Sequence, residues 1–129
     1  LNNGPVSWRS NLQTITAQST AEAEIIAATD CVKEVVHARL IMEELGAADV
    51  NAGPTTVYED NRAAQLMCHN EKSNKGAKHF EVRVRFLQER VQDGTVRFIP
   101  IATDNQTADI FTKPLSEVKF RKFAAQLVS

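Results

Sequence analysis

The sequence has little of what marks secreted or membrane-spanning proteins. Its 129 residues include two cysteines, Cys31 and Cys68, which are too few for a disulfide framework and are typical of a reducing compartment. No apolar run approaches the roughly 18 residues of a membrane-spanning helix, and the first residues lack the basic and then apolar pattern of a signal peptide. We therefore expect an intracellular protein, in the cytoplasm or the nucleus, without a membrane partner.

The chain also lacks a large net charge, because fifteen Lys and Arg oppose sixteen Asp and Glu. With 43% hydrophobic residues, the composition is not that of a disordered chain, and the length suits a single domain over residues 1–129. The charge is unevenly distributed. Residues 22–60 contain nine acids and two Lys or Arg, whereas residues 71–90 contain six Lys or Arg and three acids. This pattern indicates either a cation site beside an anionic partner or two solvated helix faces.

Three short β-prone runs predict strands over residues 6–9, 55–58 and 95–99, the last of which is stopped by Pro100. From residue 55 onward, strands alternate with helical patterns, which is typical of the α/β class. Three strands are few for the five helical segments that the sequence also contains.

The longest helix is expected to begin at a capping box, Ser19-Thr20-Ala21-Glu22, in which Glu22 is a capping residue, and to stop near Gly46. An apolar stripe predicts a second helix over residues 80–91; its members are Phe80, Val84, Leu87 and Val91. The other helices are expected over residues 62–68, over residues 103–111 after a second capping box, and over residues 116–127, with Ser116 as cap and Val118, Phe123 and Leu127 inward.

Three acids fall where the ends of these elements can meet. Glu24 lies in the first turns of the long helix, Asp60 follows the second strand, and Asp109 lies in the first turns of the helix after the last strand. Each acid is also explained by the helix dipole or by capping. Carboxylates that are brought together repel one another, and Mg²⁺ relieves that repulsion. Two such ions can activate water and stabilise the leaving oxygen in phosphodiester cleavage.

Five motifs give the chain a more specific likeness. They are residues 6–10, 19–24, 58–61, 78–83 and 103–114, and the most specific run is Ala108-Asp109-Ile110-Phe111-Thr112-Lys113-Pro114. In order and spacing, these motifs resemble the ribonuclease H domain of copia-type retrotransposon polyproteins across essentially the whole chain.

The resemblance implies a ribonuclease H-like mixed sheet flanked by helices, and an Asp-Glu-Asp-Asp set that binds two Mg²⁺ ions, with Mn²⁺ as a possible substitute. It implies cleavage of the RNA strand of an RNA/DNA hybrid as part of a reverse transcriptase polyprotein. Glu24 matches the family's glutamate, Asp60 its third acid and Asp109 its fourth. These three residues are therefore the expected metal-binding and catalytic residues.

The chain departs from the family at its start. The family's first aspartate lies on an opening strand upstream of Leu1, and no acid here precedes Glu22. We therefore expect an N-terminally truncated domain that cleaves poorly or not at all by itself. The missing strands would leave open sheet edges, and three arrangements would relieve this: pairing of the remaining strands into a smaller sheet, a second copy of the chain, or a complementing upstream segment. Of these we favour the second copy, a homodimer.

In the same comparison, a basic loop and the start of the next helix would bind the phosphates of the hybrid. Lys and Arg supply an affinity for nucleic acid that does not depend on the base sequence. The expected nucleic-acid contacts are Asn61, Lys75, Lys78, His79 and Arg83. The alternative is that the arginines only solvate a helix face.

Two other functional hypotheses stay open. The chain could be a domesticated, non-catalytic remnant that binds nucleic acid or another protein. It could also be a transposase or integrase relative with the same fold, but the acidic spacing of those proteins differs from the motifs here.

Overall fold

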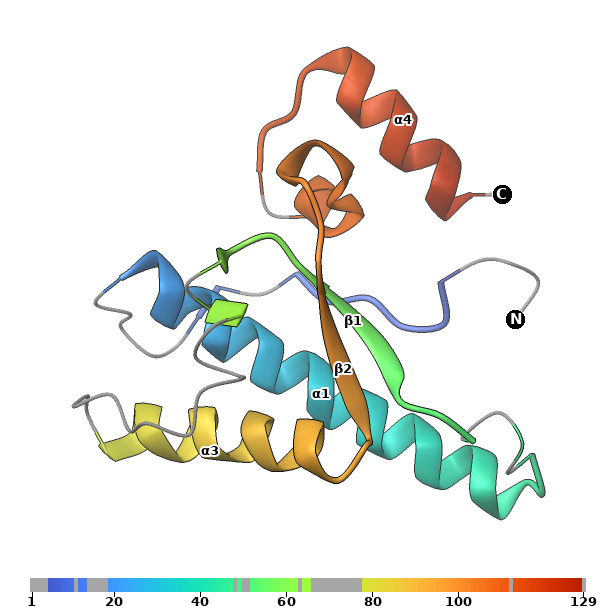
Figure 1. Cartoon of the computed structure of the whole chain (residues 1–129). Coiled ribbons are helices and arrows are strands. Elements are labelled where there is room, and N and C mark those ends of the chain that lie inside the picture. Colours follow the sequence, from blue (N-terminus) through green and yellow to red (C-terminus); the bar gives the residue numbers. More distant parts are fainter. Residues whose placement is uncertain are drawn as a thin grey trace. The chain divides into compact units, whose positions relative to one another are not determined.

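The chain forms two compact units in this computed structural model, which describes residues 5–10, 12–13, 19–47, 49, 52–62, 64–65, 78–111 and 113–128. One unit comprises residues 17–100 and contains a two-stranded sheet with two long helices (Figure 1). The other comprises residues 1–16 and 101–129 and contains two 3-10 turns and the C-terminal helix. No helix among the described residues is both long enough and apolar enough to cross a membrane.

Helix α1 spans Thr20–Glu44, as the capping signals predict. The Oγ of Ser19 accepts a hydrogen bond from the backbone N–H of Glu22 at 3.2 Å, which confirms the capping role expected of this segment. At the other end, Gly46 adopts φ 76° and donates to the carbonyl of Glu43, while Ala47 donates to the carbonyl of Met42. This pair of hydrogen bonds satisfies carbonyls that the end of a helix leaves unpaired, and it requires the left-handed conformation that glycine tolerates best.

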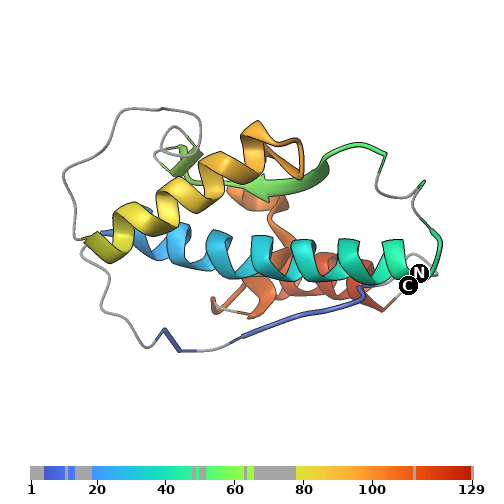
Figure 2. The ribbon, with the colours of Figure 1, turned by 90° about the horizontal axis from the view of Figure 1, so that it is seen from below.

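Strands β1 (Thr55–Glu59) and β2 (Val96–Pro100) are parallel, with Val57 opposite Phe98. Parallel strands need a crossover connection, and here helix α3 (Lys78–Gln92) lies between them in the sequence. Helices α1 and α3 pack on the same face of the sheet (Figures 1 and 2). The core of this unit consists mainly of their inner faces and that face of the sheet: Ile25, Ala28, Val32, Val57, Ala64, Phe80, Leu87, Val96 and Phe98.

The apolar stripe that predicts α3 is confirmed, since Phe80 and Leu87 are buried and Val84 and Val91 pack against the core. Only part of the helix expected over residues 62–68 can be judged. Arg62, Ala64 and Gln65 are helical, whereas residues 66–77 lie outside the described part of the chain.

The strand expected over residues 6–9 is wrong. Among the described residues the sheet contains β1 and β2 alone, and residues 6–9 are exposed, with Val6 72% and Trp8 67% accessible. An apolar, β-prone run becomes a strand only when a neighbouring strand pairs with it. The described sheet is therefore parallel rather than mixed, with two strands instead of the predicted three.

The C-terminal unit differs from the expected pattern in two places. The helix predicted over residues 103–111 is instead two 3-10 turns, Thr103–Asn105 and Thr107–Phe111, and no side chain caps the first. Helix α4 (Glu117–Leu127) begins after Ser116, as expected, although the Ser116 side chain makes no capping hydrogen bond. Phe123 is fully buried, but Val118 is 79% exposed, because five residues at about 100° each place the two side chains on different faces of the helix.

Polar contacts join α4 to the first 3-10 turn of this unit. The Nζ of Lys122 donates to the Oδ1 of Asn105 at 2.7 Å and to the backbone carbonyl of Asp104, and Lys119 forms an ion pair with Asp104. The same Lys122 ammonium lies 5.6 Å from the centre of the ring of Phe123, which is fully buried.

Candidate metal centre

The carboxyl end of β1 meets the second turn of α1, and acids lie on both elements. Val57 and Glu59 point to the same, buried face of β1, because side chains two apart on a strand share a face. Glu59 is only 6% exposed. Glu24 lies one turn before the buried Ala28 on α1, so it faces the same region. Asp60 directly follows the strand and is half-buried.

One carboxylate oxygen from each of Glu24, Glu59 and Asp60 lies within 4.8 Å of the other two. Two of these acids, Glu24 and Asp60, are among the three predicted from the sequence. Glu59 was not predicted. The alternation along β1 could have revealed it, since Val57 at the centre of an apolar strand implies a buried side chain two residues later.

The environment of Glu59 disfavours its negative charge. Burial and the nearby carboxylates of Glu24 and Asp60 raise the pKa of Glu59 from 4.5 to about 7, although hydrogen bonds from the backbone of Asn61 and Asp60 act in the opposite direction. The charged neighbours that act on Glu59 are thus both acids. A cation at this position would remove the repulsion.

The start of the segment after β1 is held by polar contacts. The backbone N–H of Asn61 donates to the Oε1 of Glu59 at 2.9 Å, and the Oδ1 of Asn61 accepts from the N–H of Ala64 at 3.1 Å. The side chain of Gln65 donates to the backbone carbonyl of Glu59 at 2.5 Å. Asn61 therefore has two structural roles: its side chain caps the helical turn that follows, and its backbone N–H fixes the carboxyl group of Glu59.

Asp109, the third predicted ligand, belongs to the other compact unit. It lies in the turn Thr107–Phe111 and is 8% exposed, and its Oδ1 accepts a hydrogen bond from the Nζ of Lys113 at 2.8 Å. Within that unit, then, a lysine ammonium neutralises the buried carboxylate. Of the predicted set, the structure brings Glu24 and Asp60 together within one unit.

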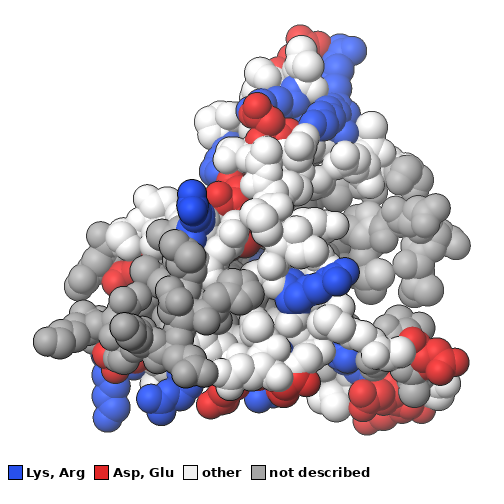
Figure 3. Space-filling view, viewed as in Figure 1, with Lys and Arg blue, Asp and Glu red and all other residues white. Residues whose placement is uncertain are grey.

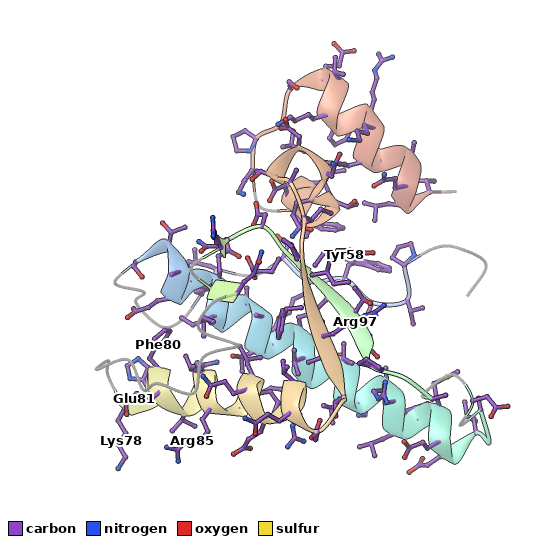
Figure 4. All side chains as sticks on the ribbon, in the orientation of Figure 1. Tyr58, Lys78, Phe80, Glu81, Arg85 and Arg97 are labelled. Atoms are coloured by element: carbon purple, nitrogen blue, oxygen red, sulfur yellow. The ribbon has the colours of Figure 1, made fainter. Side chains whose placement is uncertain are left out.

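The predicted nucleic-acid contacts differ in exposure. Lys78 and His79 are exposed at the start of α3, and Figure 4 shows Lys78 and Arg85 extending away from the sheet. Arg83 is half-buried, and its Nη1 is buried without a hydrogen-bond partner among the described residues. Lys75 lies outside the described part of the chain.

The charges on α1 and α3 segregate. In Figure 3, Lys and Arg side chains gather over the first turns of α3, at the lower left, and acidic side chains gather near the end of α1, at the lower right. The start of α3 thus exposes the basic side chains of Lys78 and Arg85, and Figure 4 labels the acid Glu81 beside them.

The donor set at the end of β1 suits a hard divalent cation. Carboxylate oxygens are the ligands that Mg²⁺ and Mn²⁺ prefer, and the three acids offer no sulfur or imidazole that would favour a softer metal. The residues thus fit the Mg²⁺ that the motif resemblance implies.

Comparison with known proteins finds similarity to transposon polyproteins. It is 35% identical over 117 residues, 91% of its length, to the retrovirus-related Pol polyprotein from transposon TNT 1-94 of Nicotiana tabacum. It is 32% identical over 127 residues, 98% of its length, to the Pol polyproteins from transposons RE1 and RE2 of Arabidopsis thaliana.

The homologues are therefore retrovirus-related Pol polyproteins of plant transposons, which supports a place for this chain in a retrotransposon polyprotein. The chain spans only 8–9% of the length of these relatives. No protein-family model matches the sequence, and no solved structure matches it significantly.

Proposed function

We propose that the chain is the ribonuclease H-type part of a retrotransposon Pol polyprotein, with a ribonuclease H-like fold, and that it cleaves the RNA strand of RNA/DNA hybrids. The observation that carries this proposal is the meeting of Glu24 and Asp60, which are far apart in the sequence, in one acidic cluster. The motif resemblance assigns metal binding to both residues independently of their positions in space. The similarity to retrovirus-related Pol polyproteins supports the coarser part of the proposal, a role in a retrotransposon polyprotein.

In this proposal Glu24 and Asp60 hold the metal through carboxylate oxygens. Bound Mg²⁺ would activate a water molecule and stabilise the oxygen that leaves the phosphodiester. The chain's own contribution is to position these acids. Packing of α1 against the sheet sets Glu24, and the end of β1 sets Asp60.

The substrate would be held by the basic surface at the start of α3. Lys78 and His79 are exposed there, and Lys75 and Arg83 are the neighbouring expected contacts. Lys and Arg would bind phosphates irrespective of base sequence, whereas recognition of RNA requires contacts with 2′-hydroxyls. The amide of Asn61, next to Asp60, is the proposed polar contact of that kind.

The acid set of this chain lacks one member of the family pattern, since no Asp or Glu precedes Glu22. We propose that these 129 residues cleave weakly by themselves, and that an added segment carrying an aspartate raises the rate of cleavage. Among the described residues each strand of the sheet has one edge that no other strand pairs with, where a second copy of the chain or such a segment could add a strand.

The exposed Lys78 and His79 at the start of α3 equally suit a second candidate, a remnant that binds nucleic acid without turnover. The experiment that separates the two uses an RNA/DNA hybrid with labelled RNA and Mg²⁺ or Mn²⁺. The chain is tested with and without an upstream segment that carries the aspartate.

Cleavage that appears on complementation, is lost in Asp60→Asn and persists in the control Glu34→Gln supports the nuclease. Salt-sensitive binding without cleavage in any combination supports the remnant and refutes the nuclease. Glu34 suits the control because it is an exposed acid on α1, the helix that carries Glu24.

A further inference from the structure

We propose that Glu59 is a third carboxylate ligand of the divalent cation at the end of β1. This inference rests on the proposed metal site and adds to it a residue that the motif comparison does not assign. With Glu59, three acids of a single compact unit would bind the cation. The motif comparison instead expects the further ligand to be an aspartate from an upstream strand.

The distances allow a shared ion. Mg²⁺ binds oxygen at about 2.0–2.1 Å, so oxygens on opposite sides of one ion are about 4.2 Å apart. The nearest set of oxygens from Glu24, Glu59 and Asp60 lies within 4.8 Å. Only one pair of the three can be opposite, but a point equidistant from three oxygens 4.8 Å apart lies about 2.8 Å (4.8/√3) from each, so an approach of less than about 1 Å by each oxygen brings all three to ligand distance. Side-chain rotation can supply that approach.

Glu59 is the most buried and best positioned of the three acids. It is 6% exposed, whereas Glu24 and Asp60 are half-buried. The hydrogen bond from the N–H of Asn61 fixes its Oε1, and Gln65 anchors its backbone carbonyl. A carboxylate has about four acceptor positions, so these contacts orient the group and leave it able to bind a cation.

A cation would also reduce the repulsion among the carboxylates of Glu24, Glu59 and Asp60. A buried carboxylate is costly unless it is paired or binds a metal, and carboxylate oxygens of Glu24 and Asp60 lie within 4.8 Å of a carboxylate oxygen of Glu59. A purely structural glutamate at the end of β1 would gain from a Lys or Arg neighbour. One divalent ion would instead offset two of the three negative charges.

The test is Mn²⁺ binding by the whole chain, measured from the electron paramagnetic resonance signal of the free ion. The variants are Glu59→Gln, Glu59→Asp, Glu24→Gln and Asp60→Asn, with Glu34→Gln as the control for loss of one acid on α1. Circular dichroism establishes that each variant is folded. Glu59→Gln retains the oxygen that accepts from Asn61, so it is expected to fold.

We expect Glu59→Gln to weaken Mn²⁺ binding at least about 10-fold. Glu59→Asp should weaken it by a similar factor, because removal of one methylene withdraws the carboxylate by about 1.5 Å while its charge is retained. Glu34→Gln should bind Mn²⁺ as the unmodified chain does.

Each other outcome has a definite meaning. If Glu59→Gln changes the affinity less than threefold, or if Glu59→Asp binds as tightly as the unmodified chain, Glu59 is not a ligand and the inference is overturned. In those cases a loss of binding in Glu24→Gln and Asp60→Asn still supports the metal site of the proposed function. Absence of Mn²⁺ binding in the unmodified chain overturns both.

Discussion

Replacing Glu59 by glutamine should stabilise the metal-free protein in neutral and alkaline solution. The pKa of Glu59 in the folded chain is raised from 4.5 to about 7, so folding favours its protonated form. The stability that this form contributes is fully present below about pH 4.5 and is lost as the pH rises through about 7. Glutamine is neutral at every pH and keeps the oxygen that accepts from Asn61.

The size of the effect follows from the pKa difference, which corresponds to at most about 3 kcal/mol. We expect about 1–2 kcal/mol, because the site lies at the end of a strand where water can reach its half-buried neighbours. The assay is urea unfolding followed by circular dichroism from pH 4.5 to 8.5 in the presence of EDTA.

Between pH 4.5 and pH 8.5 the free energy of unfolding of the unmodified chain should fall by about 1–2 kcal/mol more than that of Glu59→Gln. The variant should therefore be the more stable protein at pH 8.5. Parallel pH profiles, or a variant that is less stable at pH 8.5, would show that the three acids do not repel one another as their positions imply.

Three further variants test the packing and the local contacts. Leu87→Ala should lower the free energy of unfolding by about 2–5 kcal/mol in urea, since Leu87 is fully buried, while Val82→Ala on the exposed face of the same helix should change it by less than about 0.5 kcal/mol. Gly46→Ala should cost about 1 kcal/mol in the same assay, because φ is 76° there and no side chain obstructs a Cβ. Lys113→Met should lower the free energy of unfolding by about 1 kcal/mol in the same assay, since it removes the ion pair of the buried Asp109; an unchanged free energy of unfolding would contradict this.

The helices of the larger unit could be predicted from the sequence because their signals are local. The hydroxyl of Ser19, the glycine at position 46 and the spacing from Phe80 to Val91 act within one or two turns of the chain. Strands β1 and β2 were also expected in nearly their observed positions, since each is a short apolar run bounded by turn residues.

The errors arise where structure depends on distant neighbours. Residues 6–9 have the composition of a strand but no pairing partner among the described residues. The segment 103–111 has capping residues, but it is too short for propensity alone to stabilise a regular helix. The position of Val118 could have been predicted, because the angular spacing along α4 already separates it from Phe123.

The candidate site was predictable in part. The motif comparison identified Glu24 and Asp60, and the structure brings them together, but it could not identify Glu59, which no motif assigns. The contribution of Glu59 depends on which face of β1 is buried and on how α1 packs against it. Motif comparison thus identified Glu24 and Asp60, whereas the position of Glu59 beside them could be recognised only from the packing of β1 and α1.

The most direct test of the metal centre is a crystal structure of the chain grown with Mn²⁺, located by its anomalous scattering. We predict an ion within about 2.5 Å of carboxylate oxygens of Glu24, Glu59 and Asp60. Anomalous density elsewhere, or none at the end of β1 in crystals that contain saturating Mn²⁺, would contradict the account.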